Sequence, residues 1–166
     1  PYMGGKGMNI NLSNFVKKNY KDSQYNLFAT FMVRARQLSL KNGLVAMINM
    51  QSWMFISCYA KLRNNFLTNT TLLSMLHIGE RGFDTIGGSV VSTTAFVFKN
   101  STQTEYAGTF IRLVEGSSEL DKTKILISTL KGKNQKTKFK MSADEFKLIA
   151  GQPILYWVSD EFKNIF

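Results

Sequence analysis

The clearest periodic pattern in the chain lies between Tyr25 and Leu40, where apolar residues recur three and four positions apart. They are Leu27, Phe28, Phe31, Met32, Ala35 and Leu38. This spacing places them on one face of an amphipathic helix, and Gly43 is the expected stop signal. A shorter helix is expected over Leu12–Tyr20.

Four runs rich in apolar, β-branched and aromatic residues predict strands. They are Leu44–Ile48, Thr71–Ile78, Val90–Phe98 and Tyr106–Val114. The first is a continuous apolar run between two helical patterns, so we expect a strand that is covered on both faces. No helical pattern separates the second run from the third, which predicts an antiparallel pair at one edge of the sheet.

A helix is also expected after the first strand, with Ser52 or Ser57 as its cap. Its apolar positions are Tyr59, Leu62, Phe66 and Leu67. Ligands of α/β sheets gather at the carboxyl ends of the strands, so the segment from Asn49 to Trp53 is expected to border a pocket.

Shorter elements are expected after residue 100. Ser117 or Ser118 begins a helix of about a dozen residues. A basic stretch, Lys131–Lys140, follows, and Ser142 begins another short helix. A last amphipathic segment covers Ile154–Phe166. The sequence of elements indicates an α/β fold.

The strongest compositional feature is charge, because the 166 residues carry a formal net charge of +10 and a pI near 9.8. This balance favours a polyanionic partner, with nucleic acid ahead of a membrane surface. A solvated, lysine-rich surface is the alternative. No apolar run reaches the roughly 18 residues of a membrane span, and no leader pattern is present.

Few residues are suited to catalysis on their own. Cys58 is the single cysteine, which excludes an internal disulfide and a cysteine-rich metal site and makes a reducing, cytoplasmic setting the default. His77, the single histidine, lies in a predicted strand and is expected to be a core or edge residue. No metal-ligand spacing occurs, so no metal is expected.

An ordered series of motifs resembles a known family. Pro1-Tyr2 is similar to the end of the Asn-Pro-Pro-Tyr motif of amino-methyltransferases. The segments that follow in the family's order are Tyr25–Arg36, Asn42–Phe55, Tyr59–Arg63, Leu76–Gly88 and Val90–Asn100. Together they resemble the second half of the catalytic domain of adenine-specific DNA methyltransferases, in particular the PglX-type enzymes of BREX phage-defence systems. Gly151–Phe162 resembles a segment that follows that catalytic core.

The resemblance implies a partial, Rossmann-like methyltransferase fold with a mixed α/β extension. Residues 1–100 would be the C-terminal half of the catalytic domain, and residues 101–166 an extension leading toward the target-recognition region. The cofactor of the family is S-adenosylmethionine. Its glycine-rich loop and ribose-binding carboxylate would lie before Pro1, so we expect no cofactor binding by this stretch and no activity of the fragment alone.

The resemblance also implies the site residues. Tyr2 would stack on an adenine that has left the DNA helix, and Pro1 would shape the turn beside it. A second aromatic residue at the end of the third strand should contact the other face of the base. Phe98 is the first choice and Phe96 the second, since their period-two spacing places both on one face of the sheet. Their alternative role is that of core phenylalanines.

The implied function is methyl transfer from S-adenosylmethionine to the amino group of adenine in double-stranded DNA, in restriction-modification or phage defence. Two alternatives remain: an amino-methyltransferase acting on RNA or a protein glutamine, and a non-enzymatic DNA-binding module. Phosphate contacts are expected from five lysines, although these could equally be solvated. They are Lys6, Lys131, Lys133, Lys136 and Lys138.

The implied fold also predicts a free sheet edge. Half of a Rossmann-like sheet would leave Leu44–Ile48 without a neighbour on one side, and unpaired edges associate readily. We therefore expect this edge to be covered by self-association or by the extension.

Overall fold

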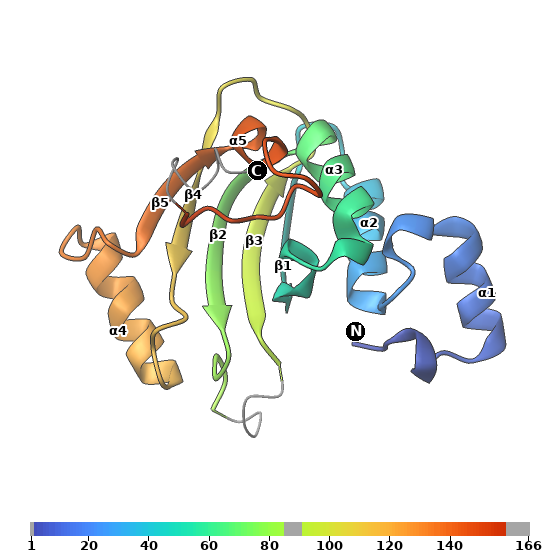
Figure 1. Cartoon of the computed structure of the whole chain (residues 1–166), viewed down its shortest axis with the longest axis horizontal. Coiled ribbons are helices and arrows are strands. Elements are labelled where there is room, and N and C mark those ends of the chain that lie inside the picture. Colours follow the sequence, from blue (N-terminus) through green and yellow to red (C-terminus); the bar gives the residue numbers. More distant parts are fainter. Residues whose placement is uncertain (1, 85–90, 159–166) are drawn as a thin grey trace.

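The computed structural model describes residues 2–84 and 91–158. Its centre is one five-stranded sheet with the order β1-β3-β2-β4-β5 (Figure 1). The strands are β1 Leu44–Met50, β2 Thr71–Gly79, β3 Thr93–Lys99, β4 Ala107–Arg112 and β5 Lys138–Ser142. The β2–β4 pair is parallel and the other three pairs are antiparallel, so β1, β2 and β4 run in one direction and β3 and β5 in the other.

Five α-helices accompany the sheet in the described ranges. They are α1 Ile10–Asn19, α2 Leu27–Leu38, α3 Ala60–Asn69, α4 Glu119–Leu130 and α5 Ala143–Lys147. Side chains of Asn9, Asn26 and Ser118 accept backbone N–H bonds at the starts of α1, α2 and α4. The helix predicted after the first strand is confirmed as α3, with Leu62, Phe66 and Leu67 buried. Its predicted cap is wrong, because neither Ser52 nor Ser57 caps it and a 3₁₀ turn leads into α3 through Tyr59.

The hydrophobic core lies on one face of the sheet, under α2, α3 and α5. Aromatic and aliphatic side chains from both layers fill it, among them Phe28, Met32, Leu62, Phe66, Met75, Phe96, Phe98, Phe110 and Phe146. We call this the covered face. The segment before residue 158 closes it, and Arg63 of α3 holds that segment through Gly151.

The opposite face of β1 is open. Val45 is 6% exposed, whereas the alternate residues Leu44 and Ile48 are 63% and 54% exposed. Alternation along the strand therefore directs one set of side chains into the core and the other to the open face. The expectation that this strand is covered on both faces is wrong for the described residues, since α2, α3 and α5 pack on the covered face and Leu44 and Ile48 are exposed on the other.

The predicted antiparallel pair of strands, β2 and β3, is confirmed, but its predicted place at an edge is wrong. β1 pairs with the far side of β3, and β4 pairs with the far side of β2. The extension thus adds β4 and β5 at the side of the sheet away from β1. It does not cover the edge formed by β1, which corrects one of the two expectations for that edge.

Candidate active site

Tyr2 lies in a pocket on the open face, at the carboxyl ends of β1 and β2. The pocket has a volume of about 340 Å³, and its walls are Tyr2, Ile48, Arg81, Gly82, Phe83, Val91 and Thr93. Ile48 and Thr93 point to the open face by strand alternation. Four separate segments therefore meet at this pocket: the N-terminal segment, the end of β1, the residues after β2 and the start of β3. Pro1 lies outside the described residues.

Backbone pairing with the start of α2 sets the position of Tyr2. Leu27 N donates to Met3 O at 3.0 Å, and Gly5 N donates to Tyr25 O at 3.1 Å. Met3 N donates to the Asn26 side chain at 3.2 Å. The Tyr2 hydroxyl then reaches the outer edge of the sheet, where it donates to Ile48 O at 3.3 Å. The aromatic ring is 56% exposed, so it remains accessible to a ligand.

Phe83 is the second aromatic residue of this pocket, and sequence reasoning missed it. It follows Gly82, whose added Cβ would collide with Ile78 Cγ2 and lie 3.3 Å from Thr93 Oγ1. Only glycine allows this close approach of the Phe83 segment to the sheet. The signal was present as an aromatic residue directly after glycine in the loop between two antiparallel strands. A loop position carries no periodicity, however, and periodicity directed attention to the strand instead.

The structure does not bring Phe96 or Phe98 to Tyr2. Their shared face is the covered one, where they are 3% and 1% exposed. Phe98 packs on Phe66 with ring centroids 5.0 Å apart, and Phe96 packs on Trp53 at 5.4 Å. The expected contact of these rings with a base opposite Tyr2 therefore does not fit this arrangement. Both residues belong to the core, and the sheet separates them from the pocket.

The predicted phosphate-binding lysines fall into two separate groups. Lys6 lies in the N-terminal segment near Tyr2, whereas Lys131, Lys133, Lys136 and Lys138 surround the turn between α4 and β5, at the other side of the sheet (Figure 1). All five are exposed. None forms an ion pair with another residue of the described ranges. Their charges are therefore available to a polyanion, but not as one continuous patch.

His77 is confirmed as a satisfied, buried residue, 4% exposed. Its Nε2 lies 2.7 Å from Gln51 Oε1 and its Nδ1 lies 2.9 Å from the Tyr156 hydroxyl. Because the amide oxygen only accepts, Nε2 donates and Nδ1 accepts from the tyrosine. Burial, aided by the charges of Arg112 and Lys122, lowers the pKa of His77 to about 4. The ring is therefore neutral at physiological pH.

The expected pocket beside the segment from Asn49 to Trp53 exists for part of that segment. Gln51 lines a hollow with His77 on the covered face, whereas Asn49 and Trp53 are each 1% exposed. Cys58 is no activated nucleophile, because burial raises the pKa of its thiol. The described residues contain no cluster of three side chains suited to a metal ion. No helix among them is long and apolar enough to cross a bilayer.

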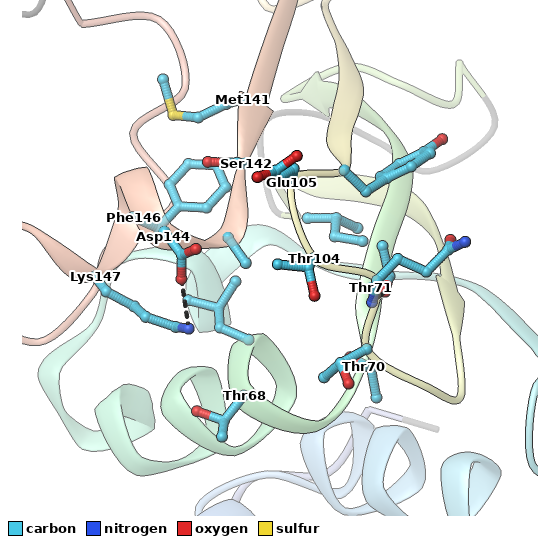
Figure 2. A pocket seen from close by; sticks show the side chains of 16 residues that line it. Thr68, Thr70, Thr71, Thr104, Glu105, Met141, Ser142, Asp144, Phe146 and Lys147 are labelled. Atoms are coloured by element: carbon cyan, nitrogen blue, oxygen red, sulfur yellow. Dashed lines mark hydrogen bonds and ion pairs between the residues drawn. The ribbon is translucent and has the colours of Figure 1, made fainter.

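A further hollow lies at the amino end of β2 (Figure 2). Hydroxyl and carboxylate groups line it, from Thr70, Thr71, Thr104, Glu105 and Ser142, and its volume is about 200 Å³. At its rim Lys147 pairs with Asp144 at 2.8 Å. It opens at the end of the strand opposite to Tyr2, so it takes no part in the site.

The fold agrees with comparisons to known proteins. Residues 1–83, half of the chain, match the Eco57I restriction-modification methylase family, and the chain belongs to that family. It is 46% identical over 167 aligned positions to the adenine-specific methyltransferase BrxX of Escherichia coli O9:H4 (strain HS). It is 38% identical over 159 positions to the adenine-specific methyltransferase PglX of Lacticaseibacillus casei (strain Zhang). These alignments cover 100% and 96% of the chain, which spans 13% of the length of each relative.

Solved structures show the same architecture at low sequence identity. One is the methyltransferase subunit of a type I restriction-modification system from Streptococcus thermophilus, with a TM-score of 0.61, 14% identity, and coverage of 87% of this chain and 34% of that one. Another is the type IIG restriction endonuclease BpuSI, with a TM-score of 0.60, 11% identity, and coverage of 95% and 19%. The chain therefore has a mixed α/β fold with a five-stranded sheet like that of type I methyltransferase subunits.

The described residues do not fit the family's methyl donor, S-adenosylmethionine. Donor binding calls for a glycine-rich loop between a strand and a helix. The connection from β4 to α4 comes nearest, with Gly116 before the helix. Carboxylates of Glu119 and Asp121 occupy the first helical turn and would repel the donor's carboxylate. Lys122 also fills the space beside Gly116, since an added Cβ there would lie 2.7 Å from Lys122 Cγ.

Proposed function

We propose that the longer protein carrying this chain transfers a methyl group from S-adenosylmethionine to the amino group of adenine in double-stranded DNA. The observation that supports this most directly is the pairing of Tyr2 and Phe83 in one pocket of about 340 Å³. Enzymes that modify a base in DNA turn it out of the stack and hold it between aromatic or apolar side chains. Tyr2 and Phe83 supply such walls.

Each residue of this pocket has a proposed task. Tyr2 and Phe83 stack on the extruded adenine, and Ile48 and Val91 exclude water from its edges. Arg81 supplies a positive charge at the same pocket for the flanking phosphate. Pro1 shapes the turn beside the base. The methyl donor is held by residues other than the described ones, and this chain positions the acceptor.

We propose that the two parts of the chain have separate roles. Residues 1–100 form the C-terminal half of a Rossmann-like catalytic domain, and residues 101–166 extend its sheet toward the target-recognition region. Lys6 contacts phosphates beside the target base. Lys131, Lys133, Lys136 and Lys138 contact a more distant part of the duplex, which adds salt-dependent affinity without sequence preference.

The outer edge of β1 is a proposed contact surface. Leu44 and Ile48 expose large apolar side chains on the open face beside this edge, and in the described ranges β1 pairs with β3 alone. We propose that the isolated 166-residue chain self-associates through this edge. Sedimentation should detect a dimer that Ile48→Lys converts to a monomer, and a monomer at all concentrations would contradict the proposal.

The test of function is methyl transfer by the full-length protein from labelled S-adenosylmethionine to duplex DNA, transfer RNA or glutamine-containing protein. We expect N6-methyladenine in DNA. Phe83→Ala should lower the rate by about 10- to 100-fold, since stacking on a base contributes about 1–3 kcal/mol. Phe15→Ala is the matched control, because Phe15 is an exposed residue of α1 outside the pocket. Transfer to RNA or protein, or an unchanged rate for Phe83→Ala, would overturn the proposal.

A further inference from the structure

A second large pocket lies on the covered face, at the carboxyl ends of β1, β2 and β4. Its volume is about 620 Å³, and Phe55, His77 and Trp157 are its aromatic walls. We call it the aromatic pocket. It is separate from the pocket of Tyr2, because His77 shares the covered face with Met75 two residues earlier on β2, whereas Ile48 faces the other way. Its volume lies in the range of small-molecule sites.

The three aromatic rings pack against one another and present planar, uncharged surfaces to the pocket. Phe55 and Trp157 meet nearly edge to face with centroids 5.7 Å apart. His77 lies 5.6 Å from Trp157 and 6.0 Å from Phe55. Both nitrogens of His77 are engaged by Gln51 and Tyr156, which fixes the ring. Such walls suit a flat ring that stacks or packs edge to face.

Arg112 is the one cation among the described residues that line this pocket. The Arg112 guanidinium lies 5.1 Å above the centre of the Trp157 ring. Its Nη2 is 3.4 Å from Glu115 Oε1, whereas Nη1 is buried without a hydrogen-bond partner among the described residues. Nη1 itself is out of reach of solvent, but the Arg112 side chain as a whole is 27% exposed, so an anionic oxygen can pair with the accessible part of the guanidinium.

The sign of this charge decides between two ligand classes. Aromatic boxes also hold quaternary ammonium groups, but a cation would meet Arg112 and the buried Lys122 beyond it. Glu80, at the same pocket, and Glu115, beside Arg112, are the opposing carboxylates. Burial is the main cause of the lowered pKa of His77, and the charges of Arg112 and Lys122 lower it further, so positive charge lies close to this ring. An anionic aromatic ligand fits better than a cation.

We propose that the aromatic pocket binds a nucleotide unit, with its base against Trp157 and Phe55 and its phosphate paired with the accessible part of the Arg112 guanidinium. The unit is either a free nucleoside monophosphate or one residue of a DNA strand. The DNA source rests on the proposed function, and the free nucleotide does not. In neither case is this the base that receives the methyl group, because Tyr2 and Phe83 lie on the other face.

The test is saturation-transfer NMR on the full-length protein with deoxythymidine monophosphate as the probe. An excess of S-adenosylhomocysteine occupies the methyl-donor site. We expect saturation of the thymine methyl and H6 protons, reduced at least fivefold in Trp157→Ala and in Arg112→Gln. Trp157→Phe keeps a ring and should retain most of the signal, which guards against loss of folding. Arg34→Gln on the exposed surface of α2 is the matched control for the charge change.

Two further experiments distinguish the role of the base from that of the phosphate, and a free nucleotide from a DNA strand. The saturation signal of thymidine, which lacks the phosphate, should fall in Trp157→Ala and stay unchanged in Arg112→Gln. Displacement of the probe by duplex DNA identifies a strand residue as the natural occupant, and persistence of the signal identifies a free nucleotide. No saturation, or equal saturation in Trp157→Ala and Arg112→Gln, overturns the proposal. Phe83→Ala should leave the signal unchanged, so failure here is distinct from failure of the methyl-transfer proposal.

Discussion

Arg63 donates two hydrogen bonds to the carbonyl oxygen of Gly151, from Nε at 2.9 Å and from Nη2 at 2.6 Å. The same guanidinium donates from Nη1 to the carbonyls of Trp53 and Ile56, each at 2.8 Å. Arg63 is 1% exposed, so this buried cation is satisfied by backbone oxygens. It joins α3, the turn after β1 and the C-terminal segment.

Loss of this joint should destabilise the chain strongly. We expect Arg63→Ala to lower the free energy of unfolding by about 3–5 kcal/mol, because several buried carbonyls would lose their donor. Urea unfolding of the 166-residue chain measures the effect. Arg34→Ala, an exposed change on α2, should stay within about 0.5 kcal/mol. A cost below about 1 kcal/mol for Arg63→Ala would mean that water replaces the guanidinium.

Gly108 lies at a close approach between the first hundred residues and the extension. An added Cβ on this β4 residue would collide with the carbonyl oxygen of Leu72 on β2. Gly108→Ala should therefore cost about 1–3 kcal/mol by forcing the two strands apart. Gly5→Ala is the matched control, since a Cβ there meets no atom within 4 Å. Thermal unfolding compares the two, and equal midpoints would show that β4 shifts without cost.

His77 should make stability depend on pH. Burial lowers its folded pKa to about 4 from the usual 6.5, so between these values the unfolded chain binds more protons. The free energy of unfolding therefore rises with pH through this window. The stabilising contribution of neutral His77 is lost as the pH falls from 6.5 to about 4. The contribution is at most about 3 kcal/mol. His77→Gln should flatten the profile between pH 4 and 6.5, and an unchanged slope would assign the effect to carboxylates.

Tyr2 combines a stacking ring with a hydroxyl that reaches Ile48 O. Tyr2→Phe keeps the ring and removes one exposed hydrogen bond, so methyl transfer by the full-length protein should fall by only about 2- to 5-fold. Tyr2→Ala removes the ring and should lower the rate by about 10- to 100-fold. Single-turnover kinetics with duplex DNA distinguish the two variants. Equal rates for Tyr2→Ala and the unaltered protein would exclude a stacking role.

Local patterns predicted local structure well. The apolar spacing correctly predicted α2, and Phe28 and Met32 face the core, whereas Phe31 and Leu38 of the predicted apolar face are exposed. The Ser118 cap of α4 is confirmed as well, because its side chain accepts from Asp121 N. In both cases residues close in sequence decide the outcome. A helix face or a cap needs no knowledge of the rest of the chain.

The candidate site depended on relationships that local patterns do not contain. Period two correctly placed Phe96 and Phe98 on one face, but which face the helices cover depends on how α2 and α3 pack on the sheet. Phe83 lies outside any regular element, so no spacing pointed to it. Its place beside Tyr2 results from strand order, since β3 pairs with β1 and brings the residues after β2 to the N-terminal segment.

The parallel pairing of β2 with β4 has a practical consequence for dissecting this protein. Ending the polypeptide at residue 100 would strip β2 of its neighbour β4 and remove Tyr156, whose hydroxyl lies 2.9 Å from Nδ1 of the buried His77. The boundary at residue 100, which motif similarity suggests, is therefore unsuitable for truncating the protein. Limited proteolysis should release no stable piece ending there, because both sides of that boundary melt together.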